Sequence, residues 1–442
     1  MTTSRRTWSL AWLACLMVTL LCEARAQSPV QDYWAGTASV GAEQTRIALT
    51  ITREGDQMSA QLSLLDIGVM GWPVETITQE GSAIRAAFRS DRGLNVLSGQ
   101  ISGERLRGRW AMAGGTDTAQ VVLALVTPPP TPRMEEITFN SGDVILSGTL
   151  VIPSGAGPWP GVVFVHGAGA ETRDASRFLA SYYAERGIAS LIYDKRGAGQ
   201  SGGDWQAVGF DALAQDVLAA VEVLKRRSEI DPAAIGLRGQ SQGGWVAPLA
   251  ASQSTEIAFV VTVAGPLVPP AEEGHWDAVR ALQLAGYDTT VIAEVDALLA
   301  ERDEAVRTGN WEPYRAALTK AQQRPWFDAS GVSPEVNPDS WLWPWYRKIL
   351  DFDPVPVFES LSIPLLALLG AEDESIPAQK SASILRRLRD DGHRPYTIVV
   401  YASVNHAMRK VPTGPEFQWP AYADGFLDRQ VEWILEAQSR RK

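Results

Sequence analysis

Cysteine is almost absent from this sequence. The 442 residues include only two, Cys15 and Cys22, and both lie within the first 26 positions. Residues 27–442 therefore contain no thiol, so they can form no disulfide bond and supply no cysteine nucleophile or cysteine ligand for zinc. Function classes that depend on cysteine are excluded for this part of the chain.

Basic clusters and histidine are scarce as well. The formal net charge is −11, and loss of residues 1–26, with their three arginines and one glutamate, would make it −13. An acidic chain without a basic run is not expected to bind nucleic acid or an anionic membrane. The sequence also contains only four histidines, which makes the search for a general base short: His166, His275, His393 and His406.

The first 26 residues predict a secretory signal peptide. Arg5 and Arg6 precede an apolar run from Trp8 to Leu21, and Ala24-Arg25-Ala26 supplies the small residues of a cleavage site. The run is too short to span a membrane comfortably, although an uncleaved anchor is the alternative interpretation. We expect a mature chain that begins at Gln27, is periplasmic or secreted, and has no stable insertion in the membrane.

Residues 27–127 predict a small antiparallel all-β domain. Apolar and polar residues alternate from Ile47 to Ile51 and from Met58 to Leu64, with a hairpin turn at Glu54-Gly55-Asp56. The pattern is typical of a sandwich or barrel, and we interpret the domain as a structural or docking module. A proline-rich linker, 128–132, follows and predicts few contacts between the cores on either side of it.

Residues 133–442 predict a second domain, of the α/β class. Apolar runs alternate with helical stretches, as expected for a mostly parallel sheet that is covered on both faces. The runs are 162–165, 188–193, 234–237, 257–263, 364–369 and 396–401. Functional residues of such sheets gather at the carboxyl ends of the strands, and the chemical motifs of this chain follow these runs.

Ser241 is the predicted nucleophile. It stands in Gly239-Gln240-Ser241-Gln242-Gly243, between an apolar run and an apolar helical stretch. A serine on a sharp strand-to-helix turn needs small neighbours such as Gly239 and Gly243, and the helix N-terminus beside it stabilises negative charge. The alternative interpretation is a glycine-rich turn that merely contains a serine.

Two further strand ends supply an acid and a base. The turn after 364–369 offers three carboxylates, and its G-x-x-D spacing favours Asp373, with Glu372 and Glu374 as rivals. The loop after 396–401 contains His406. We take His406 as the base because the other histidines stand before the serine, in an insertion, or among charged residues.

Residues 266–360 interrupt the α/β rhythm and predict a helical lid. The stretch 291–307 places apolar residues on one helical face, and an insertion at this point would lie over the Ser241 pocket. The insertion is also rich in tryptophan, with Trp276, Trp311, Trp326, Trp341, Trp343 and Trp345. We interpret most of these side chains as the core of the insertion and one or two as pocket lining.

The order serine, acid, histidine resembles that of the α/β-hydrolase fold. Residues 133–442 are similar to secreted bacterial serine esterases of that superfamily, in the style of dienelactone hydrolases and of the S9 and S33 peptidases. The motifs are H-G-A-G at 166–169, Y-D-K-R-G-A-G-Q-S at 193–201, the Ser241 motif, G-A-E-D-E-S-I-P at 370–377 and N-H-A-M at 405–408. The N-terminal domain departs from the peptidases, because about 100 residues cannot form their propeller.

The resemblance implies a mechanism and its residues. His406 would act as general base on Ser241, Asp373 would orient His406, and the amides of Ala168 and Gln242 would hold the oxyanion. The expected reaction is hydrolysis of small-molecule carboxylic esters with short to medium acyl chains, through an acyl-enzyme and without a metal or cofactor. In the glycine-rich loop after 188–193, Asp194 and Arg196 are interpreted as scaffold.

Two other functions stay open at this point. A serine peptidase would use the same residues and a subsite for a peptide amino terminus, for which Glu272, Glu273 and Glu301 are candidates. A non-catalytic binding protein would keep the fold without the chemistry, but the complete set of serine, acid and histidine argues against it. The natural ester, the oligomeric state and the role of the N-terminal domain stay open.

Overall fold

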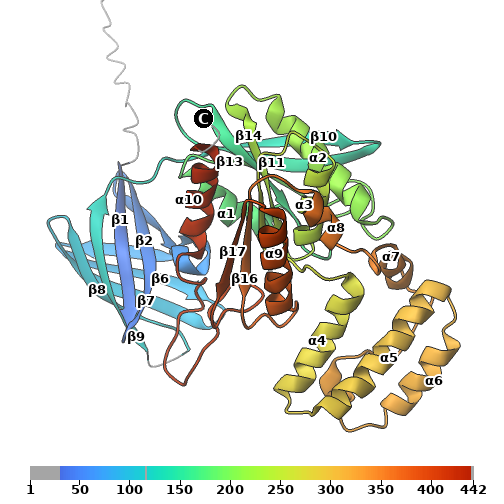
Figure 1. The fold of residues 1–442 in the computed structure, drawn as a ribbon. Coiled ribbons are helices and arrows are strands. Elements are labelled where there is room, and N and C mark those ends of the chain that lie inside the picture. The colour runs from blue at the N-terminus through green and yellow to red at the C-terminus, as the bar shows by residue number, and fades with distance from the viewer. Residues whose placement is uncertain (1–29, 115–116, 440–442) are drawn as a thin grey trace, which may run out of the picture.

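The computed structural model describes residues 30–114 and 117–439. The predicted signal peptide lies outside these residues. Two sheets dominate the described chain, one of nine strands in the N-terminal part and one of eight strands in the rest (Figure 1). Within the described residues, no helix is long and apolar enough to cross a membrane.

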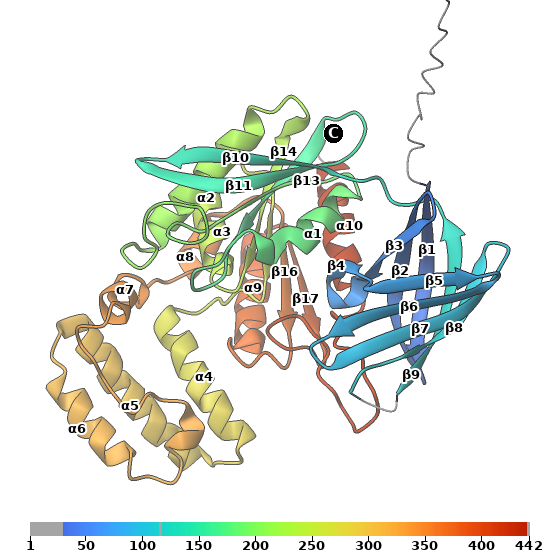
Figure 2. The same ribbon diagram turned by 180° about the vertical axis from the view of Figure 1, so that it is seen from behind.

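The N-terminal sheet is antiparallel throughout and strongly curved (Figure 2). Its strand order is β4-β3-β2-β1-β9-β8-β7-β6-β5. Alternate side chains enter one core, which includes Trp34, Leu49, Phe88 and Trp110, because successive residues of a strand face opposite sides. The strands are β1 (Val30–Val40), β2 (Glu43–Glu54), β3 (Gln57–Leu64), β4 (Val69–Pro73), β5 (Thr76–Glu80), β6 (Ala83–Ser90), β7 (Gly93–Ser102), β8 (Arg105–Ala111) and β9 (Thr118–Val126).

The second sheet has the order β10-β11-β13-β12-β14-β15-β16-β17. The first two pairs, β10 with β11 and β11 with β13, are antiparallel. All the following pairs in this order, from β13 with β12 to β16 with β17, are parallel. Every residue of β13 and β16 is buried, as expected for strands covered on both faces. The strands are β10 (Arg133–Ser141), β11 (Val144–Ile152), β12 (Trp159–Val165), β13 (Ala189–Tyr193), β14 (Ile230–Gln240), β15 (Val260–Val263), β16 (Leu365–Gly370) and β17 (Tyr396–Tyr401).

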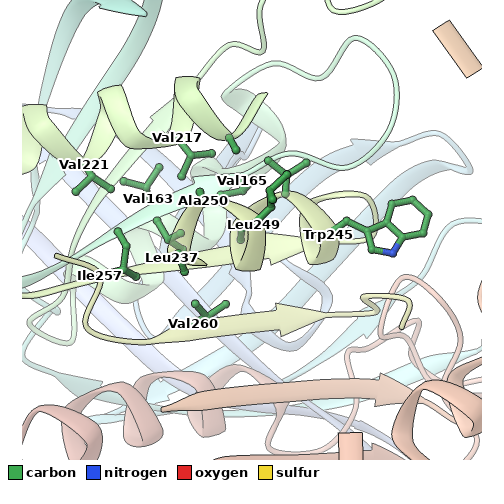
Figure 3. Packing of buried hydrophobic residues seen from close by; sticks show 14 of the residues in the cluster. Val163, Val165, Val217, Val221, Leu237, Trp245, Leu249, Ala250, Ile257 and Val260 are labelled. Atoms are coloured by element: carbon green, nitrogen blue, oxygen red, sulfur yellow. The ribbon is translucent and has the colours of Figure 1, made fainter. Parts of the chain in front are cut away.

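Helices cover both faces of this sheet. α1 (Asp174–Ala184) and α10 (Phe426–Ser439) pack on one face. α2 (Phe210–Lys225), α3 (Gly243–Ser252) and α9 (Ala378–Gly392) pack on the other. Figure 3 shows the second face, where Val163 and Leu237 of the strands meet Val217 of α2 and Leu249 of α3. This arrangement is the predicted α/β domain.

The insertion between β15 and β16 is helical. It contains α4 (Pro270–Leu284), α5 (Thr289–Thr308), α6 (Glu312–Ala321), α7 (Leu342–Ile349) and α8 (Val355–Ser360). α4, α5 and α6 share a small core of their own, with Leu282, Leu299 and Tyr314 fully buried. Of the tryptophans, Trp326 is buried in this core and Trp311 packs against it.

The two domains share more contacts than the proline linker predicts. The loop after β17 enters the N-terminal domain, where Trp419 is 4% exposed and Ala421 is 3% exposed within the β-sheet core. The amide of Tyr422 donates to the carbonyl of Asp66 at 2.7 Å. Arg46 of β2 pairs with Asp66 at 2.6 Å and with Asp428 of α10 at 3.2 Å. The expectation of few contacts is therefore wrong, because the contacting loop is far from the linker in sequence.

Candidate active site

Ser241 occupies a strained turn between β14 and α3. Its φ is +51°, a left-handed conformation that costs free energy for a residue other than glycine. The turn is possible only with glycine on both sides. A Cβ at Gly239 would lie 1.9 Å from the carbonyl oxygen of Gly243, and one at Gly243 would lie 2.5 Å from that of Val165.

Asp373 and His406 meet at the neighbouring strand ends. His406 Nδ1 lies 3.0 Å from Oδ1 and 2.9 Å from Oδ2 of Asp373. The amides of Ser375 and Ile376 each donate to Asp373 Oδ1 at 2.9 Å. The carboxylate side chain is fully buried, so its position and that of the imidazole ring are fixed by several hydrogen bonds.

The two rival carboxylates have other partners. Glu372 accepts from Arg280 of α4 at 2.9 Å, which ties the turn to the insertion. Glu374 Oε2 accepts from the backbone amide of His406 at 3.1 Å. Glu374 therefore holds the histidine loop without contacting the ring nitrogen that Asp373 engages.

The environment of His406 favours its protonated form. Burial alone lowers the pKa of the imidazole, but the hydrogen bond and charge of Asp373, with the charges of Glu374 and Glu273, outweigh it and raise the pKa above its usual range. A base with such a pKa accepts a proton from a hydroxyl readily once it is neutral.

Ser241 lines a cavity of about 660 Å³ between the sheet and the insertion. Glu374 and Glu273, whose charges act on His406, line the same cavity. Within the described residues the Ser241 hydroxyl has no hydrogen bond to His406. Such bonds are often long without substrate and shorten in the reactive complex.

The amides of Ala168 and Gln242 are available to a ligand. Both residues line the cavity beside Ser241, Ala168 after β12 and Gln242 at the start of α3. In the part of the chain that the structure describes, neither backbone N–H donates a hydrogen bond to the protein. Unpaired N–H groups at a helix N-terminus stabilise negative charge.

The insertion supplies the apolar wall of the cavity. The side chains include Trp245 of α3 and, from the insertion, Leu299, Leu342, Trp343, Trp345 and Tyr346. Two of the insertion's tryptophans thus line the pocket, as the sequence predicts for one or two of them. Two acidic residues also line the cavity. They are Glu273 and Asp277, which lie one turn apart on α4.

The side chains of the other histidines have different partners or are exposed. His166 Nε2 contacts the carbonyl oxygen of Tyr193. Burial, together with the charge of Lys195, lowers the pKa of His166 to about 4, although the Tyr193 carbonyl opposes this. His275 pairs with Asp303 at 3.0 Å in the insertion, and His393 is exposed after α9.

Two residues of this region are not evident from the sequence alone, Asp277 and Lys195. Asp277 belongs to no sequence motif, although its spacing of four from Glu273 places both carboxylates on one face of α4. Nothing in the local sequence distinguishes Lys195 from its charged neighbours. Those neighbours act as scaffold: Asp194 pairs with Arg173 at 3.0 Å and Arg196 with Asp216 at 2.6 Å.

The sheet order, the strained serine turn and the acid–histidine pair at adjacent strand ends define an α/β-hydrolase fold. A family model described as serine aminopeptidase, S33, matches residues 158–307, about a third of the chain. Esterase EstD of Thermotoga maritima is 25% identical over 323 residues, which cover 70% of this chain and 69% of that protein.

Two other proteins match a similar share of this chain. Thiohydrolase aneE of Aspergillus aculeatus is 25% identical over 323 residues, covering 68% of this chain and 92% of that protein. The solved structure of the Pyrococcus furiosus esterase Pf2001 is 18% identical with a TM-score of 0.45, over 70% of this chain and 91% of that chain. The structure therefore has an α/β-hydrolase fold, and the sequence matches to the serine aminopeptidase family and to esterase EstD support a hydrolase.

Proposed function

We propose that the protein is a serine esterase that hydrolyses carboxylic esters of short to medium acyl chains. The observation that carries the proposal is the contact of His406 Nδ1 with both oxygens of Asp373, at the strand ends beside the strained Ser241 turn. The similarity to esterase EstD supports it.

The arrangement suits acyl transfer to Ser241. Neutral His406 would take the hydroxyl proton as the serine oxygen attacks the ester carbonyl, and would then return it to the departing alcohol. Asp373 would hold the ring with Nε2 toward the serine and stabilise the imidazolium. Water, activated by His406, would then release the acid and restore Ser241.

The amides of Ala168 and Gln242 would hold the tetrahedral oxyanion. Loss of one such donor costs roughly 3 kcal/mol of transition-state stabilisation in other hydrolases. The apolar wall formed with the insertion would receive the acyl chain. Each buried methylene gains about 0.8 kcal/mol until the pocket is full, so activity should rise from acetate to a short or medium chain and fall for palmitate.

A second candidate is hydrolysis of substrates with a free amino group, including aminoacyl amides. Glu273 and Asp277 line the cavity that contains Ser241, and neither side chain has an ion pair or hydrogen bond in the described chain. Burial, with the charge of Asp277, raises the pKa of Glu273 to about 7. A substrate ammonium would favour the charged carboxylate. The match to the serine aminopeptidase family supports this candidate.

One experiment separates these functions from simple binding. The purified protein would be treated with a fluorophosphonate probe and assayed on p-nitrophenyl esters from acetate to palmitate, beside aminoacyl p-nitroanilides. We expect labelling of the wild type, none of Ser241→Ala, and butyrate or hexanoate as the best substrate. If an aminoacyl anilide proved the best substrate, the second candidate function would be favoured. Activity of Ser241→Ala above about a hundredth of wild type would contradict both.

The proposal extends to the place of action. The charged, apolar and small-residue segments of residues 1–26 support export to the periplasm or medium. Amino-terminal sequencing of the protein from the periplasmic fraction should begin at Gln27.

A further inference from the structure

Lys195 is a buried lysine behind the oxyanion amides. It stands directly after Asp194 in the loop that follows β13, and it is 2% exposed. Its Nζ donates to the carbonyl oxygen of Gly167 at 2.9 Å and to Oε1 of Gln242 at 2.7 Å. One ammonium group therefore joins the two loops that provide Ala168 and Gln242.

The first contact acts on the Ala168 amide through a single peptide group. The carbonyl of Gly167 and the N–H of Ala168 belong to the same planar unit, so Nζ lies within about 5 Å of that nitrogen. A cation bonded to the carbonyl oxygen polarises the peptide and makes its N–H a stronger donor. The positive charge is also close enough to attract an oxyanion directly.

The second contact fixes the other donor. Gln242 is the residue before α3 and is 4% exposed. Its side chain is held by Lys195, so the backbone amide of the same residue has little freedom to turn away from the cavity. The two loops are far apart in sequence, and Lys195 sets the distance between their amides.

The electrostatic setting of Lys195 differs from that of its neighbours. Asp194 and Arg196 each have an oppositely charged partner, whereas Lys195 has no ion pair within residues 30–114 and 117–439. The ring of Trp205 lies 5.2 Å from its Nζ. A buried ammonium without an ion pair is costly to keep for packing alone, even with the charge of Glu171 acting on it, and such charges concentrate at functional sites.

We propose that Lys195 is a positioning residue that sets the oxyanion amides and strengthens them by its charge. The proposal rests on the function proposed above, because it requires an oxyanion at Ala168 and Gln242. It predicts that Lys195 affects the transition state and leaves ground-state substrate binding nearly unchanged.

The charge should also leave a mark on the pH profile. Burial lowers the pKa of Lys195 to about 8, while the charge of Glu171 raises it. The charge of Lys195 in turn lowers the pKa of His166, which is neutral near pH 8. Turnover should therefore fall as pH rises through about 8, when the ammonium loses its proton.

The experiment compares Lys195→Met, Lys195→Arg and the control Arg196→Met in the full chain. Arg196→Met breaks a buried ion pair in the same loop without touching the oxyanion amides. On p-nitrophenyl butyrate we expect Lys195→Met to lower kcat roughly 10- to 100-fold, less than the full loss of a donor, with KM nearly unchanged. The affinity of a trifluoromethyl ketone, which mimics the tetrahedral state, should fall by the same factor.

The variants Arg196→Met and Lys195→Arg should behave differently from Lys195→Met. Arg196→Met should lower Tm but change kcat by only a few-fold. Lys195→Arg keeps its charge at all accessible pH values, so the fall above about pH 8 seen in the wild type should disappear. This comparison stays decisive if Lys195→Met does not fold, as judged by circular dichroism and gel filtration.

The outcomes distinguish this proposal from the function on which it rests. If the wild type shows no Ser241-dependent hydrolysis, both fall together. If hydrolysis depends on Ser241 but Lys195→Met keeps kcat within about threefold, or Lys195→Arg keeps the wild-type basic limb, only the role of Lys195 is overturned. Equal kcat losses in Lys195→Met and Arg196→Met would reduce Lys195 to a structural residue and overturn it as well.

Discussion

The indole ring of Trp419 lies 5.5 Å from that of Trp110, inside the core of the N-terminal domain. Trp419 belongs to the loop that carries His406. The two ends of this loop pair with each other, since the amide of Lys410 donates to the carbonyl of Ala421 and that of Ala423 to the carbonyl of Met408. The N-terminal domain therefore holds the segment that follows the proposed base.

Removing the N-terminal domain should impair the hydrolase. A protein of residues 133–442 would expose Trp419 and Ala421, so we expect it to aggregate or to lose most of its activity. In the full chain, Trp419→Ala should lower the free energy of unfolding by about 3–5 kcal/mol and lower kcat. Denaturant titration and ester assays would measure both.

A matched control is Trp433→Ala. This variant removes a buried tryptophan of α10 that packs on the second sheet and not in the core of the N-terminal domain. Trp433→Ala should lower the free energy of unfolding by a similar amount to Trp419→Ala, but it should lower kcat less. A soluble monomer of residues 133–442 with wild-type kcat would show that the N-terminal domain has no part in holding the loop.

Asp373→Asn should reduce kcat roughly ten-thousandfold, as for the orienting acid of serine proteases. The amide would favour the wrong tautomer of His406, because its NH₂ donates a hydrogen bond and cannot accept one from the Nδ1–H group. Glu372→Gln and Glu374→Gln should have much smaller effects, since these side chains meet Arg280 and the His406 backbone instead. A larger loss in either glutamate variant would reassign the acid.

The acidic limb of the pH profile should report His406. Hydrolysis requires the neutral ring, and the pKa of His406 is raised against the lowering effect of burial by Asp373, Glu374 and Glu273. Activity should therefore rise with pH through a midpoint above about 6.5. Glu374→Gln keeps an acceptor for the His406 amide but removes a charge, so its midpoint should be lower.

Glu272→Gln serves as the control for this profile, because Glu272 pairs with Lys380 of α9. Its midpoint should equal that of the wild type. If kcat/KM of the wild type were already constant below pH 6, or Glu374→Gln left the midpoint unchanged, the assignment of the limb to His406 would fail.

Glu273→Gln tests the amine subsite of the second candidate function. If the carboxylate binds a substrate ammonium, the variant should lose roughly tenfold or more in kcat/KM on alanine p-nitroanilide. Because the charge of Glu273 also acts on the pKa of His406, each protein is compared on the plateau of its own pH profile, where the N-acetylated anilide and p-nitrophenyl butyrate should be unaffected. Glu301→Gln is a suitable control because this exposed side chain does not line the cavity. Equal kinetics of Glu273→Gln on all three substrates would remove the second candidate.

Sequence alone determined the elements whose physical cause is local. The strained turn at Ser241 follows in part from Gly239, because any larger residue there would collide with the carbonyl oxygen of Gly243, four residues later. The two sheets follow from strand patterns, alternating in the first domain and continuous in the second, since burial on one or both faces leaves a different periodicity.

Tertiary structure alone decided which distant groups meet. Asp373 stands between two glutamates in sequence, and only the bend after β16 turns it, and neither neighbour, toward His406 Nδ1. Lys195 reaches Gly167 and Gln242 because parallel strands bring three strand ends to one edge of the sheet. Trp419 enters a domain almost 300 residues earlier in the chain. Such contacts depend on the path of the whole backbone, which no local periodicity records.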